Sequence, residues 1–148
     1  MKKIYVDYAA TTPVDKRVLQ KVIPYFSDFF ANPSSPHFMG KEVKKALEKS
    51  RMDIANSLGC KTEEIIFTSG GTEAENLALK GISFPLKHFG KHIIISSVEH
   101  NAINASVEYL KRFGFTVDTL PVDTKCNILI DKLPQLLRND TIMVAIMY

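Results

Sequence analysis

Residues 65–76 read Ile65-Ile66-Phe67-Thr68-Ser69-Gly70-Gly71-Thr72-Glu73-Ala74-Glu75-Asn76 and predict a short strand that turns through two glycines into a helix. The β-branched and aromatic run at 65–68 has the length of a buried strand, and glycine permits a tight turn. Thr72 and Glu75 fit a capping box at the start of the helix. The backbone amides of that first turn are equally suited to bind a phosphate, so an anion site and an ordinary capped helix both remain open.

Further strands and helices alternate on the carboxyl side of this stretch. Apolar runs at 92–97, 115–120 and 141–147 predict strands, and helical periodicity marks 101–113 and, more weakly, 129–138. The triple isoleucine at 93–95 indicates a strand covered on both faces. An alternation of this kind is typical of an α/β fold with a mainly parallel sheet and flanking helices.

The amino-terminal side of the stretch is predicted to contain two helices and a long loop. A first helix carries an apolar stripe and is interrupted or ended by Pro24, and an irregular segment with two prolines follows over 29–40. A surface helix over 41–58 should bury one face, made of Val43, Ala46, Leu47, Ile54 and Leu58, and should end at Gly59. We therefore expect an arm, helix and linker at 1–40 and the first part of a larger domain at 41–148.

Length, charge and cysteines restrict the class of protein. The chain has 148 residues, 45% of them hydrophobic, and a net charge of +3, which suits one globular domain and shows no nucleic-acid footprint. Cys60 and Cys126 form no CxxC pair and predict free thiols in a cytoplasmic protein. We expect neither a secretion signal nor a membrane span, and the histidines have no spacing of a metal site.

His100 is a second candidate for binding chemistry. Ligands of open α/β sheets bind beyond the carboxyl ends of the strands, and His100 follows the strand after the one that leads into the glycine turn. Both turns should therefore open on the same edge of the sheet. His100 could present a ring nitrogen or a flat aromatic face there, or it could simply start a helix. The motifs GxGxxG and GxxxxGK[ST] are absent, which argues against dinucleotide and nucleoside triphosphate sites.

Four blocks of the sequence resemble the amino-terminal part of cysteine desulfurases. They are Ile4-Tyr5-Val6-Asp7-Tyr8-Ala9-Ala10-Thr11-Thr12-Pro13, Asn32-Pro33-Ser34-Ser35-Pro36-His37, residues 67–76, and Val98-Glu99-His100. Their order and spacing match across essentially the whole chain, and the Ser-Gly-Gly-Thr-Glu form resembles the nitrogen-fixation and iron–sulfur branch. The resemblance implies a class-V aminotransferase of the aspartate aminotransferase fold (fold type I), with pyridoxal 5′-phosphate as cofactor.

The resemblance also implies roles for particular residues. Gly71 and Thr72 would hold the cofactor phosphate, His100 would stack on the pyridine ring as the catalytic histidine, and Ala10, Thr11 and Thr12 would lie near the substrate pocket. The implied reaction converts L-cysteine to L-alanine and leaves an enzyme persulfide for iron–sulfur cluster or thio-cofactor synthesis. The implied partners are a second copy of the protein and a sulfur-acceptor or iron–sulfur scaffold protein.

The chain also departs from the family pattern. The family's cofactor-anchoring lysine and persulfide cysteine correspond to positions beyond residue 148, so we expect this to be the amino-terminal portion of a longer enzyme and to be inactive alone. Cys126-Asn127 replaces a usual turn glycine, and we expect Asn127 to take a positive φ. The alternatives are a truncated, non-catalytic phosphate-binding or dimerisation module, and another class-V enzyme such as a selenocysteine lyase or aminotransferase.

Overall fold

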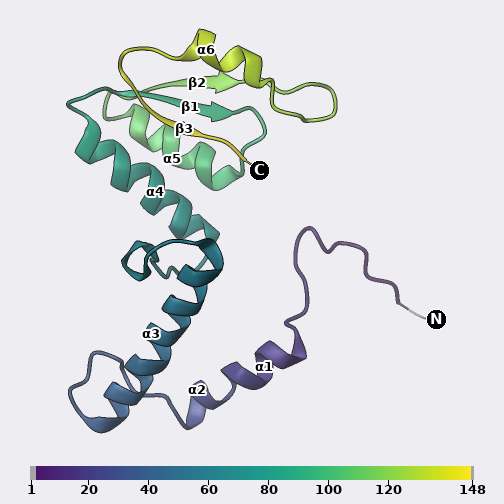
Figure 1. The fold of residues 1–148 in the computed structure, drawn as a ribbon. Coiled ribbons are helices and arrows are strands. Elements are labelled where there is room, and N and C mark those ends of the chain that lie inside the picture. Colours follow the sequence, from purple (N-terminus) through teal and green to yellow (C-terminus); the bar gives the residue numbers. More distant parts are fainter. Residues whose placement is uncertain (1–2, 148) are drawn as a thin grey trace. The chain divides into compact units, whose positions relative to one another are not determined.

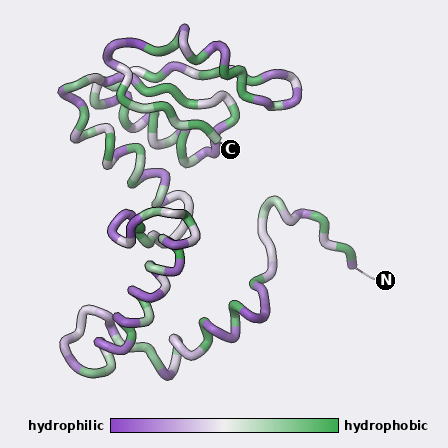
Figure 2. Tube along the Cα trace, in the orientation of Figure 1, coloured by the Kyte–Doolittle hydropathy of each residue, from purple (hydrophilic) through white to green (hydrophobic). Residues whose placement is uncertain are grey.

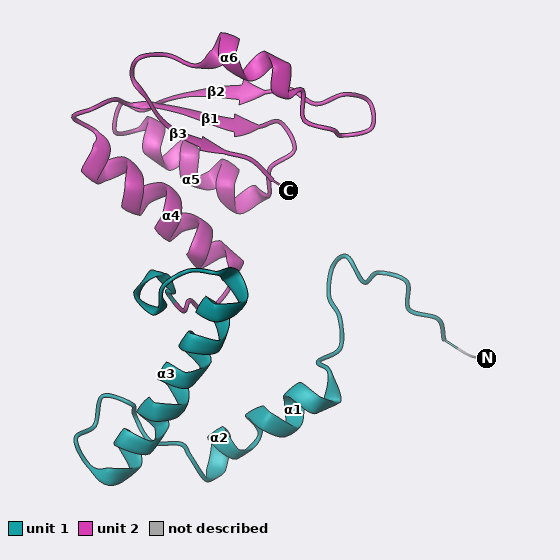
Figure 3. Cartoon of the chain, viewed as in Figure 1, with its two compact units in different colours: residues 1–66 teal, residues 67–148 magenta. Residues whose placement is uncertain are grey.

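The computed structural model describes residues 3–147, which form two compact units. The first comprises residues 1–66 and the second residues 67–148 (Figure 3). Each unit is described by itself. The predicted division into an arm, helix and linker at 1–40 and the first part of a larger domain at 41–148 stays a prediction.

The second unit contains a three-stranded parallel sheet. Strand β1 (His92–Ser96) lies in the centre, between β2 (Thr116–Leu120) and β3 (Thr141–Ala145), in the order β2-β1-β3. Helix α4 (Gly71–Leu86) leads into β1 and helix α5 (Asn101–Lys111) connects β1 to β2, and both run against the strand direction (Figure 1). The predicted parallel α/β sheet is confirmed.

The central strand is buried along its whole length, as its isoleucine run predicts. Ile93 and Ile95 pack into one hydrophobic cluster with α4 and α5, whereas Ile94 is buried on the opposite face of the sheet. Hydrophobic colouring runs through the middle of β1 and along β3 (Figure 2). The buried members of the cluster are Leu79, Ile93, Ile95, Ile103, Val107, Leu110 and Phe115.

Two predicted elements of this part of the chain differ from the structure. The run at 65–68 forms no strand: Ile66 and Phe67 are exposed, and no described strand pairs with them. A strand needs a partner edge, which an apolar run does not supply by itself. The helix predicted over 129–138 is reduced to a 3-10 turn, η2 (Ile130–Lys132), and a short helix, α6 (Leu133–Leu136). Pro134 has no backbone N–H, which prevents one continuous helix there.

The first unit is mainly helical. Helix α1 (Lys16–Val22) stops just before Pro24, which begins α2 (Pro24–Ser27), so the predicted interruption at Pro24 is confirmed. Helix α3 (Phe38–Leu58) ends at Gly59, whose φ of 68° is left-handed, also as predicted. A 3-10 turn, η1 (Thr62–Glu64), follows.

Helix α3 differs from expectation at its start and on its predicted buried face. It begins three residues before Lys41 because the His37 side chain caps it, with Nδ1 accepting a hydrogen bond from the Gly40 N–H at 3.4 Å. Its fully buried residues are Gly40 and Ala55; of the predicted face, Val43, Ala46 and Leu47 are half-buried, whereas Ile54 and Leu58 are exposed. Helical periodicity identified an apolar stripe, but not whether another element covers it.

Candidate functional site

Helix α4 begins at the glycine corner that the sequence singled out. Gly70 is the residue before the first helical turn, Gly71 is the first helical residue and Thr72 the second. The predicted capping box of Thr72 and Glu75 is therefore wrong, because the helix starts two residues earlier than that box requires. Glu73 instead reaches back to Ser69, whose N–H and hydroxyl both donate to its Oε2 at 2.6 Å.

The amino end of α4 keeps its backbone donors available. Among residues 3–147 its N-cap makes no side-chain capping bond, and the first amides of any helix lack partners within the helix. A Cβ added at Gly70 or Gly71 would meet no atom within 4 Å, so the corner is open on the side where a side chain would stand. The Ser69 hydroxyl and N–H hold the pKa of the Glu73 carboxyl below its usual range. That carboxylate is thus turned to Ser69.

His100 begins helix α5 at the carboxyl end of β1. Its Nδ1 accepts a hydrogen bond from the Ala102 N–H at 3.2 Å, which makes it the cap of this helix. A ring nitrogen that accepts carries no proton, so Nε2 bears the proton in this arrangement. The side chain is 62% exposed, which leaves the imidazole accessible to a ligand.

The structure brings His100 next to the first turns of α4. Glu75 Oε2 lies 3.7 Å from His100 Nδ1. Because Nδ1 already accepts from Ala102, this is a close approach of a carboxylate to a neutral ring rather than an ion pair. Glu75 Oε2 is buried and has no hydrogen-bond partner among the described residues. Residue type and spacing predicted only a capping role for Glu75, because its position beside His100 depends on the packing of α4 against α5.

The predicted substrate-pocket residues lie in the first unit. Ala10, Thr11 and Thr12 are exposed, and the Ala10 N–H donates to the Asp7 carbonyl at 3.1 Å in a turn. The Tyr5 hydroxyl donates to the Thr11 carbonyl at 3.1 Å. Gly71, Thr72 and His100 belong to the second unit. The substrate-pocket role of residues 10–12 stays a prediction.

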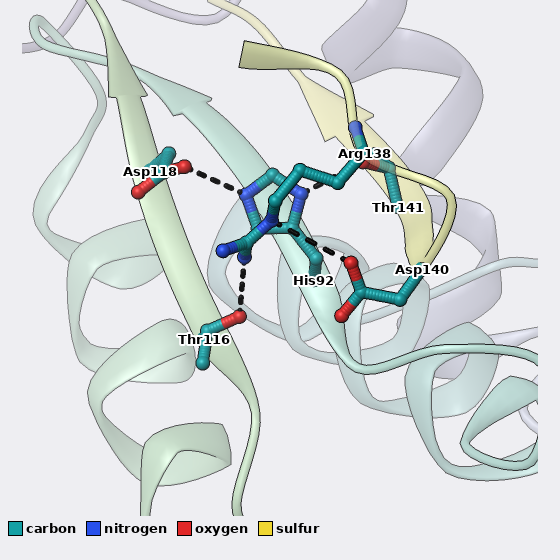
Figure 4. A network of polar contacts seen from close by, with 6 residues as sticks. All are labelled: His92, Thr116, Asp118, Arg138, Asp140 and Thr141. Carbon is teal, nitrogen blue, oxygen red and sulfur yellow. Dashed lines mark hydrogen bonds and ion pairs between the residues drawn. The ribbon is translucent and has the colours of Figure 1, made fainter.

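A second polar cluster lies at the opposite edge of the sheet, where the strands begin (Figure 4). His92 is fully buried, its Nδ1 is 2.7 Å from Thr141 Oγ1, and its Nε2 is 3.1 Å from Asp118 Oδ2 without hydrogen-bond geometry. Thr141 Oγ1 also accepts from the Arg138 N–H at 2.8 Å, so its own proton can go to Nδ1. These contacts join the three strands.

The turn after β2 differs from the prediction in which residue has a positive φ. The residue with a positive φ is Cys126, at 64°, and not Asn127. Asp123 accepts from the Lys125 and Asn127 N–H groups at 2.7 and 2.9 Å, and Asn127 also donates its side-chain amide to it at 3.0 Å. These hydrogen bonds fix the backbone and side chain of Asn127. The residue of the turn that adopts the left-handed conformation is therefore Cys126. Both cysteines are free thiols, as predicted.

Within residues 3–147 no group of three or more histidine, cysteine or acidic side chains could hold a metal ion. No helix in that same range is both long and apolar enough to span a bilayer.

The parallel sheet with flanking helices, and with His100 following the carboxyl end of its central strand, defines an α/β protein of the class in which ligands bind at that edge of the sheet. The family comparison specifies it further: residues 4–148 match the model of the family "Aminotransferase class-V". The chain belongs to the class-V aminotransferase family.

Curated relatives are similar over the whole chain. It is 46% identical over 147 residues to a protein of Dictyoglomus turgidum named cysteine desulfurase IscS, covering 99% of this chain and 37% of that one. It is 45% identical over 148 residues to a Bacillus subtilis protein named putative cysteine desulfurase IscS 1, covering 100% of this chain and 39% of the relative. The chain thus spans about two fifths of the length of these relatives.

Solved structures share the fold. A structure titled NifS-like protein superposes with a TM-score of 0.89 at 38% identity, covering 93% of this chain and 38% of the other. A second, titled SspA in complex with cysteine, superposes with a TM-score of 0.88 at 37% identity, covering 94% and 40%. The predicted fold type is confirmed by these neighbours.

Proposed function

We propose that this chain is the amino-terminal part of a pyridoxal phosphate-dependent cysteine desulfurase. The enzyme would convert L-cysteine to L-alanine and pass the sulfur, as an enzyme persulfide, to iron–sulfur cluster or thio-cofactor synthesis. The observation that carries the proposal is that α4 and the His100 imidazole meet beyond the carboxyl end of β1, with Glu75 Oε2 3.7 Å from His100 Nδ1. Similarity to proteins named cysteine desulfurase and putative cysteine desulfurase over 99–100% of the chain supports L-cysteine as the substrate.

The residues present fit a phosphorylated aromatic cofactor. The uncapped amides at the start of α4 and the positive end of its dipole favour a phosphate, and the open space at Gly71 allows close approach. The Thr72 hydroxyl would add a further donor. The negative charges of the Glu73 and Glu75 carboxylates would repel an anion bound there. For Glu73 this effect is reduced because Ser69 donates two hydrogen bonds to it.

His100 would provide the surface for the cofactor ring. With Nδ1 accepting from Ala102, the imidazole is neutral, fixed in tautomer and exposed, so it can offer a flat face and an Nε2–H donor. The bound cofactor would withdraw electrons from the substrate carbon, while the protein sets its orientation. Ala10, Thr11 and Thr12 would contribute to the substrate pocket. We further propose that the full-length enzyme is a cytoplasmic homodimer and that it delivers sulfur to an acceptor or iron–sulfur scaffold protein.

Two measurements on the natural, full-length polypeptide test this function. Pyridoxal 5′-phosphate is titrated calorimetrically into the wild type, Thr72→Val and the control Thr124→Val, which changes an exposed threonine in a distant turn. Loss of one hydrogen bond to a charged group should weaken binding about 10- to 100-fold in Thr72→Val only. Alanine and sulfide are then quantified with L-cysteine, and with L-selenocysteine as competitor. Failure to bind the cofactor, or turnover of L-selenocysteine without any turnover of L-cysteine, would exclude the desulfurase assignment.

A further inference from the structure

Glu99 occupies the turn between β1 and α5, directly before His100. Its Oε1 accepts one hydrogen bond from the Ser96 hydroxyl at 2.5 Å and another from the Met147 backbone N–H at 2.6 Å. Ser96 is the buried last residue of β1, and Met147 lies just beyond the end of β3. A single carboxylate oxygen therefore joins the carboxyl ends of two adjacent strands.

The backbone of the same turn is attached to the other neighbours of the site. The Glu99 carbonyl accepts from Asn104 Nδ2 in α5 at 3.3 Å, and the Ser97 N–H donates to the Leu120 carbonyl at the end of β2 at 3.0 Å. Bonds to all three strands and to α5 leave the turn little freedom. The Glu99 side chain links the turn to Met147, just beyond the end of β3, so this contact helps to set how the turn sits on that side of the sheet.

We propose that Glu99 is the positioning residue for His100. It would hold the turn in the one conformation that presents the imidazole beside α4, and it would act on a bound cofactor only through His100. The effect of Glu99 on cofactor binding rests on the proposed function, whereas its effect on the position of His100 does not. Hydrogen bonds accepted by a carboxylate are stronger than those between neutral groups, which suits a fixed rather than a mobile turn.

The geometric part is tested without any cofactor, in the full-length polypeptide. Three variants are compared: Glu99→Ala, Glu99→Gln, and Glu108→Ala as a control at an exposed glutamate of α5. The measurements are the NMR signals of the His100 imidazole and hydrogen exchange of residues 97–101. Glu99→Ala should shift the ring signals and speed exchange by about 100-fold or more, because each of the two lost hydrogen bonds to a charged group corresponds to at least about tenfold. Glu99→Gln keeps an acceptor oxygen and should restore most of the protection. Wild-type behaviour in Glu99→Ala would overturn the inference.

A double-mutant cycle then separates positioning from general stability. Affinity for pyridoxal 5′-phosphate is measured for Glu99→Ala, His100→Ala and the double variant. We expect Glu99→Ala to weaken binding about tenfold alone and to have no further effect once His100 is alanine. An equal loss in both backgrounds would show that Glu99 does not act through His100 and would overturn the inference. If the wild type binds no cofactor, the proposed function fails, whereas the His100 signals and exchange rates still decide the role of Glu99.

Discussion

Replacement of Gly90 by alanine tests how closely the lead into β1 packs against the lead into β3. An added Cβ would stand 2.1 Å from the Asp140 carbonyl oxygen and 2.6 Å from its carbonyl carbon. Ordinary contacts begin at about 3.4 Å, so one backbone segment must move by more than an ångström. The Asp140 carbonyl accepts the His92 N–H at 3.0 Å, and this bond would be lost in the movement.

The cost follows from two effects. Overpacking of a tight contact costs about 1–3 kcal/mol, and a lost backbone hydrogen bond adds about 1 kcal/mol, so Gly90→Ala should destabilise the second unit by about 2–4 kcal/mol. Gly81→Ala is the matched control: it lies exposed inside α4, where the nearest side-chain atom would be 3.8 Å from the new Cβ. This control should stabilise by about 0.5–1 kcal/mol.

Denaturant unfolding followed by circular dichroism gives the change in free energy, and hydrogen exchange at the His92 amide reports the local bond. Faster exchange at His92 should appear in Gly90→Ala and not in Gly81→Ala. Equal stability of the two variants, with unchanged exchange at His92, would refute the close approach of residues 90 and 140.

Three other perturbations address the core, the buried cluster and the glycine corner. Leu110→Ala removes a fully buried side chain of the core and should cost about 2–5 kcal/mol in denaturant unfolding. Thr141→Val leaves the buried His92 Nδ1 without its hydroxyl partner and should cost about 1–3 kcal/mol by the same assay. Ser69→Ala should raise the pKa of the Glu73 carboxyl towards its ordinary value in an NMR titration.

The sign of the pH effect at Glu73 follows from its lowered pKa. The stabilisation from Ser69 is complete above the pKa of the unfolded carboxyl and is lost as the pH falls through the lower, folded value. Ser69→Ala should therefore remove stability near neutral pH and little in strong acid. An unchanged Glu73 titration would show that the Ser69 contact does not persist in solution. Loss of stability below 0.5 kcal/mol in Leu110→Ala or Thr141→Val would contradict the burial of those side chains.

Elements defined by local chemistry could be predicted from the sequence. The isoleucine run of β1 and the stop at Gly59 are local signals, and both are confirmed. The run at 65–68 has equal strand character, yet it lies outside every strand of the described residues, because strand formation depends on a partner edge as well as on residue type. The left-handed residue of the turn after β2 was assigned to Asn127, whereas hydrogen bonds to Asp123 shift that conformation to Cys126.

For the site, the sequence by itself determined which groups are available: the glycine corner with Thr72 and, one strand later, His100. Their residue types and their places after apolar runs are local properties, so they can be read before folding. Only the tertiary structure decided what lies beside them. Glu75 approaches His100, and Glu99 ties its turn to β3 across 48 residues of chain, because the packing of helices and strands sets such distances. A long-range hydrogen bond depends on where two segments meet, and no short stretch of sequence specifies that.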